Sequence, residues 1–406
     1  MSLLAKGIRY YHRNGLEATL KKSIKKCARL IRTSPLCLAE TLIAPRKIEL
    51  LRRAAENKSA YVIIPCIDWS IPLFQRPHQI AWELSLREDT IVFFLPDQYQ
   101  YDSFCFCKKV KDNLYLYSTS LVKHLDKILA ASKDVLLIMT WTRQAHLLKK
   151  IKYDKLIYDY VDEMSLFYYY DKKMEETHRY LMKEANLTLA SADKLYENAK
   201  PYAKNLLLCE NAGDYNFFSE QKNSEISPLI QHSVKNYKTV LGYYGCLAYW
   251  FDYETILWSA SKRKDWLFIL VGHIFDESAE TMLLNKKTDN ILYIPAQPYK
   301  SLPTFLSAFD IALVPFVIND VTLATSPVKI FEYMAAGKAI LSADLPEIRK
   351  YKSVHHYKDR EDFICKVEEI MAHKNHQDYI ALLDKEARDN TWESRVESIL
   401  REVNKQ

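Results

Sequence analysis

From Ser59 onwards, short apolar runs alternate with longer stretches in which apolar and polar residues mix at helical spacing. Short apolar runs bounded by turn residues are typical of buried strands, and most intervals between them are long enough for a helix. Strands that alternate with helices form parallel sheets covered on both faces. The pattern therefore predicts an α/β fold. The predicted strands cover residues 61–65, 91–95, 114–117, 135–139, 156–160, 187–190, 206–208, 239–243, 266–271, 291–294 and 311–314.

A polar stretch over residues 219–238 interrupts this alternation, and we interpret it as a linker. A chain of 406 residues is long enough for two domains with full cores. The expected organisation is two Rossmann-like, doubly wound domains. The predicted segments are an N-terminal helical extension over 1–58, a first domain over 59–218, the linker, a second domain over 239–390 and a C-terminal helix over 391–406.

Residues 322–347 combine a loop, a helix, a stop and a strand. Thr325 or Ser326 is a candidate helix cap, and Pro327 suits a first turn because its missing N–H would be unpaired there anyway. Good helix formers follow, and Gly337 is the expected helix stop. The predicted elements are a helix over 328–336 and a short buried strand over 339–341.

Groups that bind phosphate meet at the start of this predicted helix. A helix N-terminus offers free N–H groups and partial positive charge, and the Thr325 and Ser326 hydroxyls and the Lys329 ammonium would lie beside it. Glu332 follows three residues later on nearly the same face. A carboxylate there repels phosphate but accepts hydrogen bonds from the vicinal hydroxyls of a sugar. Two interpretations stand, a nucleotide site or an ordinary αβ unit with an exposed Lys329–Glu332 pair.

The seven glycines exclude one class of site and indicate another. Residues 17–211 contain no glycine, so a G-x-G-x-x-G dinucleotide loop is impossible in the first domain. In the second domain Gly245 and Cys246 follow a predicted strand and precede a helix. A glycine there lets backbone N–H groups approach a phosphate, or it simply makes a tight turn. Gly272 and His273 end the next predicted strand.

Two polar clusters follow strands of the first domain, at the sheet edge where doubly wound folds bind ligands. Arg76 opens a helix close to His78, and an arginine there could stabilise a departing diphosphate; the alternative is a surface arginine and a capped histidine. Asp159, Asp162 and Glu163 lie in the segment YDYVDE. They could position an acceptor hydroxyl or accept its proton, or they form a polar loop in which Asp162 caps a helix. Arg76 and Asp162, together with Lys329 of the second domain, are the catalytic candidates.

Residues 1–58 differ in charge from the rest of the chain. Residues 1–60 hold 14 Lys and Arg against four Glu, a net charge of +10, so the remainder carries 6 − 10 = −4. An apolar stripe runs opposite the basic side chains. This segment is predicted to be a helix on an anionic membrane surface, or one whose stripe packs on the protein itself. The stripe residues are Leu16, Leu20, Ile24, Cys27 and Ile31.

Other features narrow the class of protein. The eight cysteines are scattered without zinc-site spacing, and no D-x-D pair occurs, so no metal is expected. No apolar run approaches the ~20 residues that span a bilayer, and no signal peptide is evident. The mildly acidic body argues against a nucleic-acid partner. We expect a cytoplasmic protein that is peripheral on the inner face of the cell membrane.

The segment SPVKIFEYMAAGKAILSADLPE resembles the donor-binding segment of retaining GT-B glycosyltransferases of family 4, the "group 1" glycosyl transferases. In that family the lysine contacts the diphosphate and the glutamate binds the ribose, which implies these roles for Lys329 and Glu332. The family often carries a second glutamate eight positions earlier. Ala324 stands there in this chain, which affects the expected contact to the transferred sugar and the identity of the donor.

Further blocks extend the resemblance over about residues 60–405 and include features of teichuronic-acid-type bacterial enzymes. They are QRPHQIAWEL, YDYVDE, NAGDYNFF and LGYYGCLAYWFDYE. The family's loop at Tyr299 borders the nucleotide base, and TWESRVESILREV resembles a C-terminal helix that packs back toward the first domain. The implied donor site consists of Gly245, Cys246, Gly272, His273, Tyr299, Thr325, Ser326, Lys329 and Glu332.

The resemblance implies two domains facing a cleft and transfer of a sugar from a nucleotide diphosphate sugar to a glycan or lipid-linked acceptor in bacterial surface polysaccharide biosynthesis. Retention is implied, and so is independence of metals and other cofactors, because Lys329, Arg76 and the helix N-termini near Gly245 and Ser326 would stabilise the leaving diphosphate. Two rival interpretations are a nucleotide-sugar epimerase of the same architecture and a non-catalytic glycan- or partner-binding protein. Donor, acceptor, linkage and oligomeric state stay open.

Overall fold

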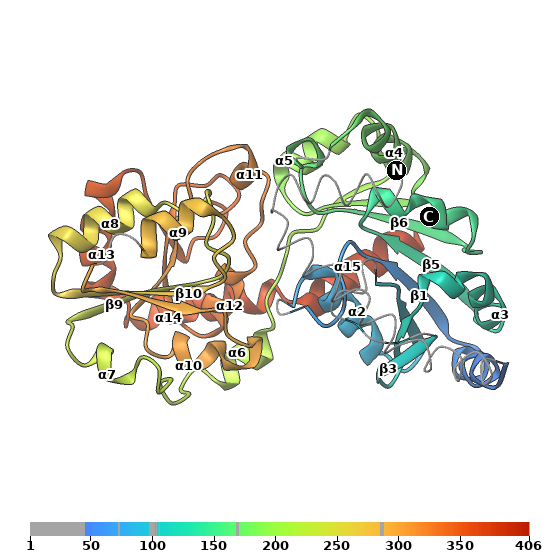
Figure 1. The fold of residues 1–406 in the computed structure, drawn as a ribbon, viewed down its shortest axis with the longest axis horizontal. Helices are drawn as coiled ribbons and strands as arrows, with labels where there is room; N and C mark the ends of the chain where they lie inside the picture. The colour runs from blue at the N-terminus through green and yellow to red at the C-terminus, as the bar shows by residue number, and fades with distance from the viewer. Residues whose placement is uncertain are drawn as a thin grey trace, which may run out of the picture. The chain divides into compact units, whose positions relative to one another are not determined.

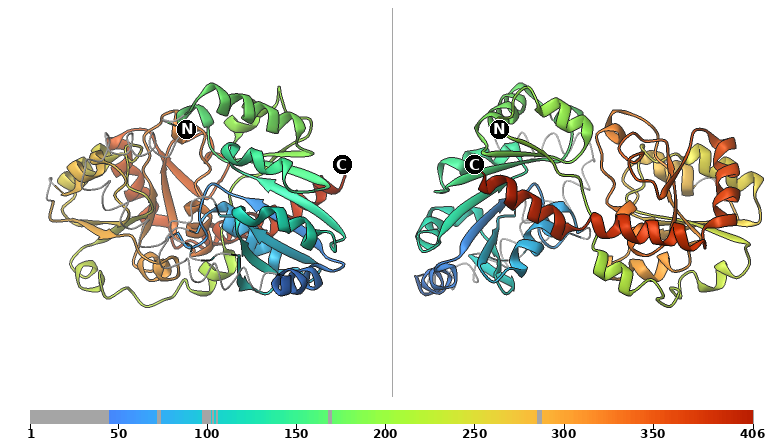
Figure 2. Two further views of the ribbon diagram at one scale, coloured as in Figure 1. Left: turned by 45° about the vertical axis from the view of Figure 1, so that its right-hand side comes forward. Right: turned by 180° about the vertical axis from the view of Figure 1, so that it is seen from behind.

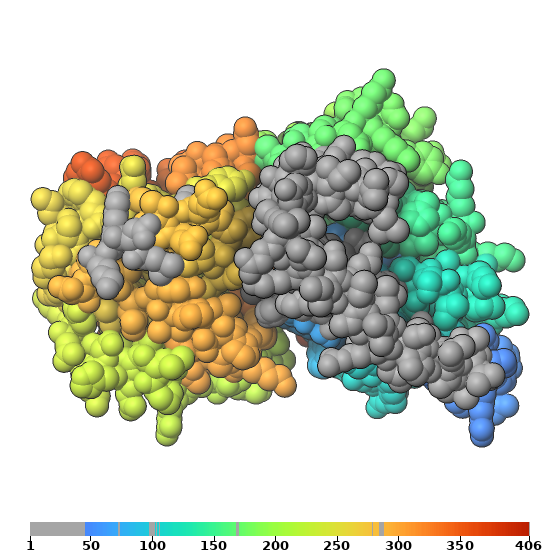
Figure 3. All heavy atoms as spheres, viewed as in Figure 1, coloured from blue at the N-terminus to red at the C-terminus, as the bar shows by residue number. Residues whose placement is uncertain are grey.

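The computed structural model describes residues 45–71, 74–96, 102, 104, 106–167, 170–284 and 288–405. Residues outside these ranges are grey in Figure 3, and the predicted basic helix with its apolar stripe lies among them, outside the described residues. The described residues divide into two compact units, the second of which takes in residues 74–83, 138–143 and those from 155 onwards. Among the described helices, none combines the length and the hydropathy that a membrane span requires.

The first sheet has eight strands in the order β3-β4-β2-β1-β5-β6-β7-β8 (Figure 1). The pairs β1–β2, β2–β4, β6–β7 and β7–β8 are parallel. Outermost strand β3 pairs antiparallel with β4 and has an irregular register between Lys109 and Lys111. The strand bounds are β1 (Ser59–Ile64), β2 (Thr90–Phe94), β3 (Cys107–Lys111), β4 (Leu114–Tyr117), β5 (Asp134–Met139), β6 (Lys155–Tyr160), β7 (Leu187–Ala190) and β8 (Leu206–Leu208).

The second sheet has six strands in the order β11-β10-β9-β12-β13-β14. All five of its pairs are parallel, as the alternation of strands and helices predicted. Chain order reverses between the neighbours β9 and β12, and in doubly wound sheets the crevice at this reversal binds ligands. The bounds are β9 (Thr239–Tyr244), β10 (Trp266–Gly272), β11 (Ile291–Pro295), β12 (Ile311–Val314), β13 (Ala339–Ala343) and β14 (Val354–Tyr357).

Helices cover both faces of the second sheet (Figure 1). On one face lie α8 (Tyr253–Lys262), α9 (Glu277–Leu284) and α13 (Arg360–His373). The other face carries α10 (Leu302–Leu306), α12 (Lys329–Ala335) and α14 (Gln377–Asp389). Between them the strands form a continuous apolar core with large buried side chains such as Trp266, Phe268 and Phe331. Burial on both faces explains why strands such as β10 and β12 are continuous apolar runs instead of alternating.

The remaining described helices connect the strands or end the chain, and the last two, α14 and α15, follow one another in red in Figure 2. They are a helix over residues 45–55, α2 (Arg76–Leu86), η1 (Thr119–His124), α3 (Leu125–Leu129), η2 (Thr142–Lys149), η3 (Met164–Leu166), α4 (Lys172–Glu184), α5 (Asp193–Ala199), α6 (Tyr215–Glu220), α7 (Gln231–Val234), η4 (Tyr299–Ser301), α11 (Asp320–Leu323) and α15 (Trp392–Asn404).

The chain reaches the second sheet earlier than the stretch interpreted as a linker. A Cβ on Gly213 would stand 2.9 Å from the Cβ of Phe331 in α12, so only glycine fits this approach. Helix α6 packs on α12 directly afterwards, and α7 lies inside residues 219–238. Polar composition alone therefore marked the stretch as a linker, although two helices occupy part of it.

Helix α12 ends as the sequence predicted and begins differently. Gly337 has φ of +66°, and the N–H groups of Gly337 and Lys338 donate to the carbonyls of Met334 and Tyr333 at 2.9 and 3.0 Å. These two hydrogen bonds form the Schellman motif, which ends a helix. At the other end the helix starts at Lys329 without a side-chain cap, so the prediction that Thr325 or Ser326 caps it is wrong.

Candidate functional site

Two glycines bring the ends of β9 and β10 into contact, beside the reversal of strand order between β9 and β12. Gly245 follows β9 with φ of +143°, a conformation that disfavours other residues. A Cβ on Gly272 would stand only 1.7 Å from the Gly245 carbonyl oxygen. The next residues continue this contact, since Leu247 N–H donates to the His273 carbonyl at 2.9 Å. Both predicted glycine positions therefore belong to one backbone cradle.

The Lys329 ammonium lies over this cradle. A Cβ on Gly245 would stand 3.1 Å from the Lys329 Cε, and the Nζ atom lies 5.2 Å and 5.0 Å from the ring centres of Tyr243 and Phe316. Among the described residues the ammonium has no hydrogen bond or ion pair. Burial lowers the pKa of Lys329 to about 8, against the opposing effects of Glu332 and Cys246. An unpaired, partly desolvated cation is a favourable contact for an anionic ligand.

Glu332 is not the exposed partner of Lys329 that the ordinary interpretation required. Its side chain is 4% exposed, and hydroxyl groups bind both carboxylate oxygens. Tyr244 donates to Oε2 at 2.6 Å and Tyr299 to Oε1 at 3.0 Å. Burial raises the pKa of Glu332, while the two tyrosines and Lys329 act in the opposite direction. Lys329 and Glu332 thus present a cation and a buried acceptor on one short helix.

The two hydroxyls expected beside Lys329 have partners within the chain. The Thr325 hydroxyl donates to the Val321 carbonyl at 2.7 Å. Ser326 is buried, and its hydroxyl accepts the Asn211 N–H at 3.3 Å while its carbonyl accepts the Asn211 side-chain N–H at 2.7 Å. Asn211 therefore holds the loop that leads into Lys329, a role that the sequence did not reveal.

Arg76 is also held within the protein. Its side chain is 2% exposed and pairs with the fully buried carboxylate of Asp159 at 2.9 Å. Another guanidinium N–H donates to the Glu210 carbonyl at 3.1 Å and to the Asn211 amide oxygen at 3.3 Å. His78 is fully buried, and its Nδ1 accepts the Gln75 N–H at 3.0 Å. This local hydrogen bond at the start of α2 matches the structural interpretation of His78. This geometry supports the residues around Asn211 and leaves Arg76 without an evident approach to a diphosphate.

The three acidic residues of YDYVDE separate into different environments. Asp159 is paired with Arg76, and Glu163 accepts hydrogen bonds from Tyr160, Asn198 and Ser165 as the cap of η3. Asp162 has no hydrogen bond or ion pair among the described residues. Its side chain is accessible to solvent, although protein atoms surround it. Partial desolvation by these atoms and the negative charge of Asp159 raise the pKa of its carboxyl. Asp162 is therefore the available carboxylate of this cluster.

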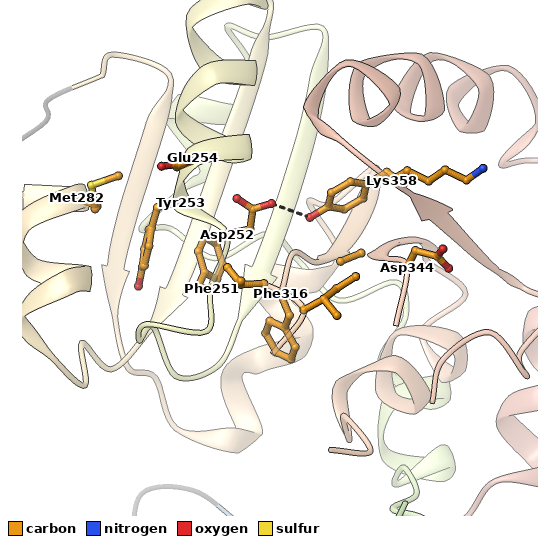
Figure 4. Close-up of a pocket in the computed structure, with 12 residues that line it drawn as sticks. Phe251, Asp252, Tyr253, Glu254, Met282, Phe316, Asp344 and Lys358 are labelled. Carbon is orange, nitrogen blue, oxygen red and sulfur yellow. Dashed lines mark hydrogen bonds between the residues drawn. The ribbon is translucent and has the colours of Figure 1, made fainter. Parts of the chain in front are cut away.

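A separate cavity of ≈ 570 Å³ opens beside the second sheet, and it was not predicted from the sequence (Figure 4). Phe251, Tyr253 and Phe316 form aromatic walls, and Asp252 lies beside them. The Tyr357 hydroxyl reaches the Asp252 carboxylate at 3.5 Å. Aromatic faces next to carboxylate acceptors suit a polyhydroxyl group better than a phosphate. Phe316 also contacts Lys329, so the cavity and the cradle share one wall.

The predicted site residues of the second sheet lie in two groups. Gly245, Cys246, Gly272 and the backbone of His273 surround the cradle with Lys329, whereas Tyr299 and Glu332 are directly hydrogen-bonded. The His273 side chain is exposed. Tyr244 is the contact that sequence reasoning missed, because a tyrosine at the end of an apolar strand gives no signal of its partner. In the described residues no group of three or more His, Cys, Asp or Glu is arranged to hold a metal ion.

Comparisons with known proteins show what the chain is similar to. Residues 254–401 match the family model described as "Glycosyl transferase-like". A curated protein of Bacillus subtilis (strain 168), named "Putative teichuronic acid biosynthesis glycosyltransferase TuaH", is 26% identical over 198 residues. That match spans 47% of this chain and 49% of the relative, about half the length of each.

Solved structures match over more of the chain. Sucrose-phosphate synthase from Thermosynechococcus elongatus has a TM-score of 0.64 at 11% identity and covers 86% of this chain and 99% of its own. Anabaena HepE in complex with UDP-glucose has a TM-score of 0.60 at 12% identity and covers 86% and 100%. Identities this low show the fold alone. Residues 254–401 thus match the glycosyl transferase-like family model, and the chain has the GT-B fold of glycosyltransferases.

Proposed function

We propose that this protein transfers a sugar from a nucleotide diphosphate sugar to a hydroxyl of a glycan or lipid-linked acceptor in bacterial surface polysaccharide biosynthesis. The observation that carries the proposal is the Lys329 ammonium, which has no partner among the described residues and lies above the Gly245–Gly272 cradle, beside the reversal of strand order. Support comes from the names of relatives, since TuaH is named for teichuronic acid biosynthesis and HepE is described in complex with UDP-glucose.

The proposed reaction breaks the bond between the anomeric carbon and the diphosphate oxygen, which leaves with the electron pair. Lys329 neutralises the charge that develops on this oxygen, with backbone N–H groups around Gly245 as further donors. The acceptor oxygen forms the new bond to the anomeric carbon, and Asp162 accepts its proton; a pKa above the usual range makes this carboxylate a better base near neutral pH. Retention of configuration is part of the proposal through the family resemblance.

Arg76 has an indirect part in this proposal. Its pairing with Asp159 and its hydrogen bond to Asn211 support the residue that fixes Ser326, three positions before Lys329. Metal independence is proposed because Lys329 and the backbone donors can replace a divalent cation at the diphosphate. We further propose that the basic segment over residues 1–58 holds the enzyme on the inner face of an anionic membrane, where a lipid-linked acceptor would be found.

A donor screen followed by a transfer assay tests the function. UDP-, GDP-, CMP- and dTDP-sugars are screened by thermal shift, because a ligand that binds the folded state raises its stability. The donor that binds is then incubated with and without candidate acceptors. Sugar transfer that needs the acceptor supports the proposal, and conversion of donor alone identifies an epimerase. Absence of any donor binding contradicts both and favours a non-catalytic binding protein.

A further inference from the structure

The way in which Glu332 is held limits what it can bind. A carboxylate has about four acceptor positions, two on each oxygen. Tyr244 occupies one position on Oε2 and Tyr299 one on Oε1. One acceptor position on each oxygen remains, and a vicinal diol presents two O–H donors at matching separation. The tyrosines therefore leave a carboxylate that is suited to two neighbouring hydroxyl groups.

The two partners of Glu332 are neutral, which preserves its charge. A lysine or arginine in place of either tyrosine would neutralise the carboxylate and attract phosphate to this position. The tyrosine hydroxyls instead stabilise the ionised form by hydrogen bonding alone. Burial raises the pKa of Glu332, and the charge of Asp214 at the start of α6 acts in the same direction, whereas Lys329 on the same helix opposes them. Without the tyrosines, the balance shifts toward the protonated acid, which cannot accept two hydrogen bonds on equal terms.

The two tyrosines have different freedom to move. Tyr244 ends the central strand β9 and is 5% exposed. Its backbone N–H donates to the Tyr333 hydroxyl at 3.3 Å, so its position is fixed by the sheet and by α12. Tyr299 lies at the start of the single-turn helix η4 and is only partly buried. Its ring stacks on Phe217 with centres 5.5 Å apart. We therefore expect a ligand that approaches Glu332 from solvent to contact Tyr299, whereas Tyr244 is buried behind the carboxylate.

We propose that Tyr244 and Tyr299 are positioning residues that make Glu332 specific for the 2′,3′-diol of ribose, so that the donor is a ribonucleoside diphosphate sugar and deoxyribonucleotide donors such as dTDP-sugars are rejected. The inference rests on the proposed nucleotide-sugar site. A site built to hydrogen-bond a hydroxyl discriminates strongly against the analogue that lacks it, because its buried acceptor is then left unpaired.

The test compares two ligands that differ only at the 2′ position. Affinities for UDP and 2′-deoxy-UDP are measured by calorimetry between pH 5.5 and 8.5, and the GDP pair is measured in parallel. The ratio of the two affinities reports the ribose contact, because the titration of Lys329 and of the diphosphate affects both ligands alike. The variants are Tyr244→Phe and Tyr299→Phe, which keep each ring. Tyr237→Phe is the control, since its hydroxyl donates to the Asp289 carbonyl at 3.1 Å and not to Glu332.

For the wild type we expect a ratio of roughly tenfold or more in favour of the ribonucleotide, as for a hydrogen bond to a charged group. In each Phe variant the ratio falls toward one. The preference for the ribonucleotide also disappears at a higher pH than in the wild type, because Glu332 is protonated more easily without the tyrosine hydroxyl. Tyr237→Phe keeps the wild-type ratio. Melting temperatures identify a variant that is unfolded; if Tyr244→Phe is, the partly buried Tyr299 still provides the test.

Three results would overturn the inference, and each has a different meaning. Phe variants with the wild-type ratio at every pH would make the tyrosines purely structural, with the proposed function intact. Equal binding of UDP and 2′-deoxy-UDP, and of the GDP pair, by the wild type would remove Glu332 from ribose recognition and leave the Lys329 site. A wild type that binds none of the four nucleotides would contradict the proposed function itself.

Discussion

The Arg76 guanidinium and the Asp159 carboxylate form a buried ion pair 2.9 Å apart, and neither side chain is more than 2% exposed. Arg76→Ala would leave the Asp159 charge buried without a partner, which typically costs 3–5 kcal/mol. We therefore expect a large loss in the free energy of unfolding, measured by denaturant titration. Asp159→Asn in the same chain should restore part of the stability. An Arg76→Ala protein that keeps wild-type stability and donor affinity but loses transfer would instead make Arg76 catalytic.

Diphosphate binding should depend on the protonation of Lys329. Its pKa of about 8 in the free protein means that the ammonium charge is present below pH 8 and is lost above it. Calorimetry with the bound nucleotide diphosphate should therefore show affinity that falls as pH rises past 8. Lys329→Arg should extend binding to higher pH because arginine stays charged. Lys329→Ala should weaken binding roughly tenfold to over a hundredfold at pH 7.

Partly exposed Lys366 provides a control for the Lys329 variants, since it pairs with Glu369 on α13. Lys366→Ala should keep the affinity and the pH profile of the wild type. If Lys329→Ala also behaves like the wild type, the diphosphate binds elsewhere.

Two glycine substitutions separate steric contact from backbone strain. Gly272→Ala would place a Cβ 1.7 Å from the Gly245 oxygen, so the cradle must move, at about 3 kcal/mol or more. In Gly337→Ala the new Cβ would have no atom within 4 Å, so the alanine meets only the strain of a φ of +66°. We expect this strain to lower the free energy of unfolding by about 1–2 kcal/mol. Both are measured by urea unfolding. Donor affinity should be lost in Gly272→Ala alone, and equal loss in both variants would contradict the role of the cradle.

Transfer activity should survive removal of divalent metal ions. Lys329 and the backbone donors at Gly245 are proposed to stabilise the leaving group directly, so dialysis against EDTA should leave the rate unchanged. The rate is measured before dialysis, after it, and after addition of Mg²⁺ or Mn²⁺. Activity that disappears with EDTA and returns with either ion would refute metal independence without affecting the assignment of the donor site.

Membrane association is predicted for residues 1–58. Residues 1–32 hold nine Lys and Arg against Glu17, and each basic residue near an anionic surface contributes about 1 kcal/mol without full additivity. The full chain should sediment with anionic liposomes and less so at high salt. A chain without residues 1–44, which keeps the helix over residues 45–55 with its buried Leu51 and Ala55, should stay in the supernatant and remain folded. Equal sedimentation of both chains, or an unfolded truncated protein, would favour a structural role for the segment.

Local patterns predicted the strands well where both faces of a sheet are buried. The bounds of β7 and β12 agree with the expected ones because both strands are buried at every position and contain only one polar residue, Thr188. Strands β3 and β14 were missed because CKKVK and VHHY lack such runs. Both lie at an edge of the described sheets, where one side has no neighbouring strand among the described residues and polar side chains are tolerated.

The side-chain types and their spacing identified Lys329 and Glu332, but they did not show which residues contact this site. Tyr244 and Tyr299 lie 88 and 33 residues from Glu332 along the chain, and Ser326 contacts Asn211 across 115 residues. Such contacts depend on how the whole chain folds. For the same reason Thr325 and Ser326 were expected to cap α12, since the local sequence does not show that Ser326 contacts Asn211.

The irregular outer strand β3 has a consequence for the behaviour of the protein in concentrated solution. An unpaired strand edge is a template on which a second chain can add a strand and begin aggregation. Strand β3 presents Lys108, Lys109 and Lys111 within five residues, and its register shifts between the last two. Repulsion between like charges and a distorted hydrogen-bond edge both oppose such addition. The feature that hid this strand from sequence analysis therefore protects the first sheet from growing beyond its own chain.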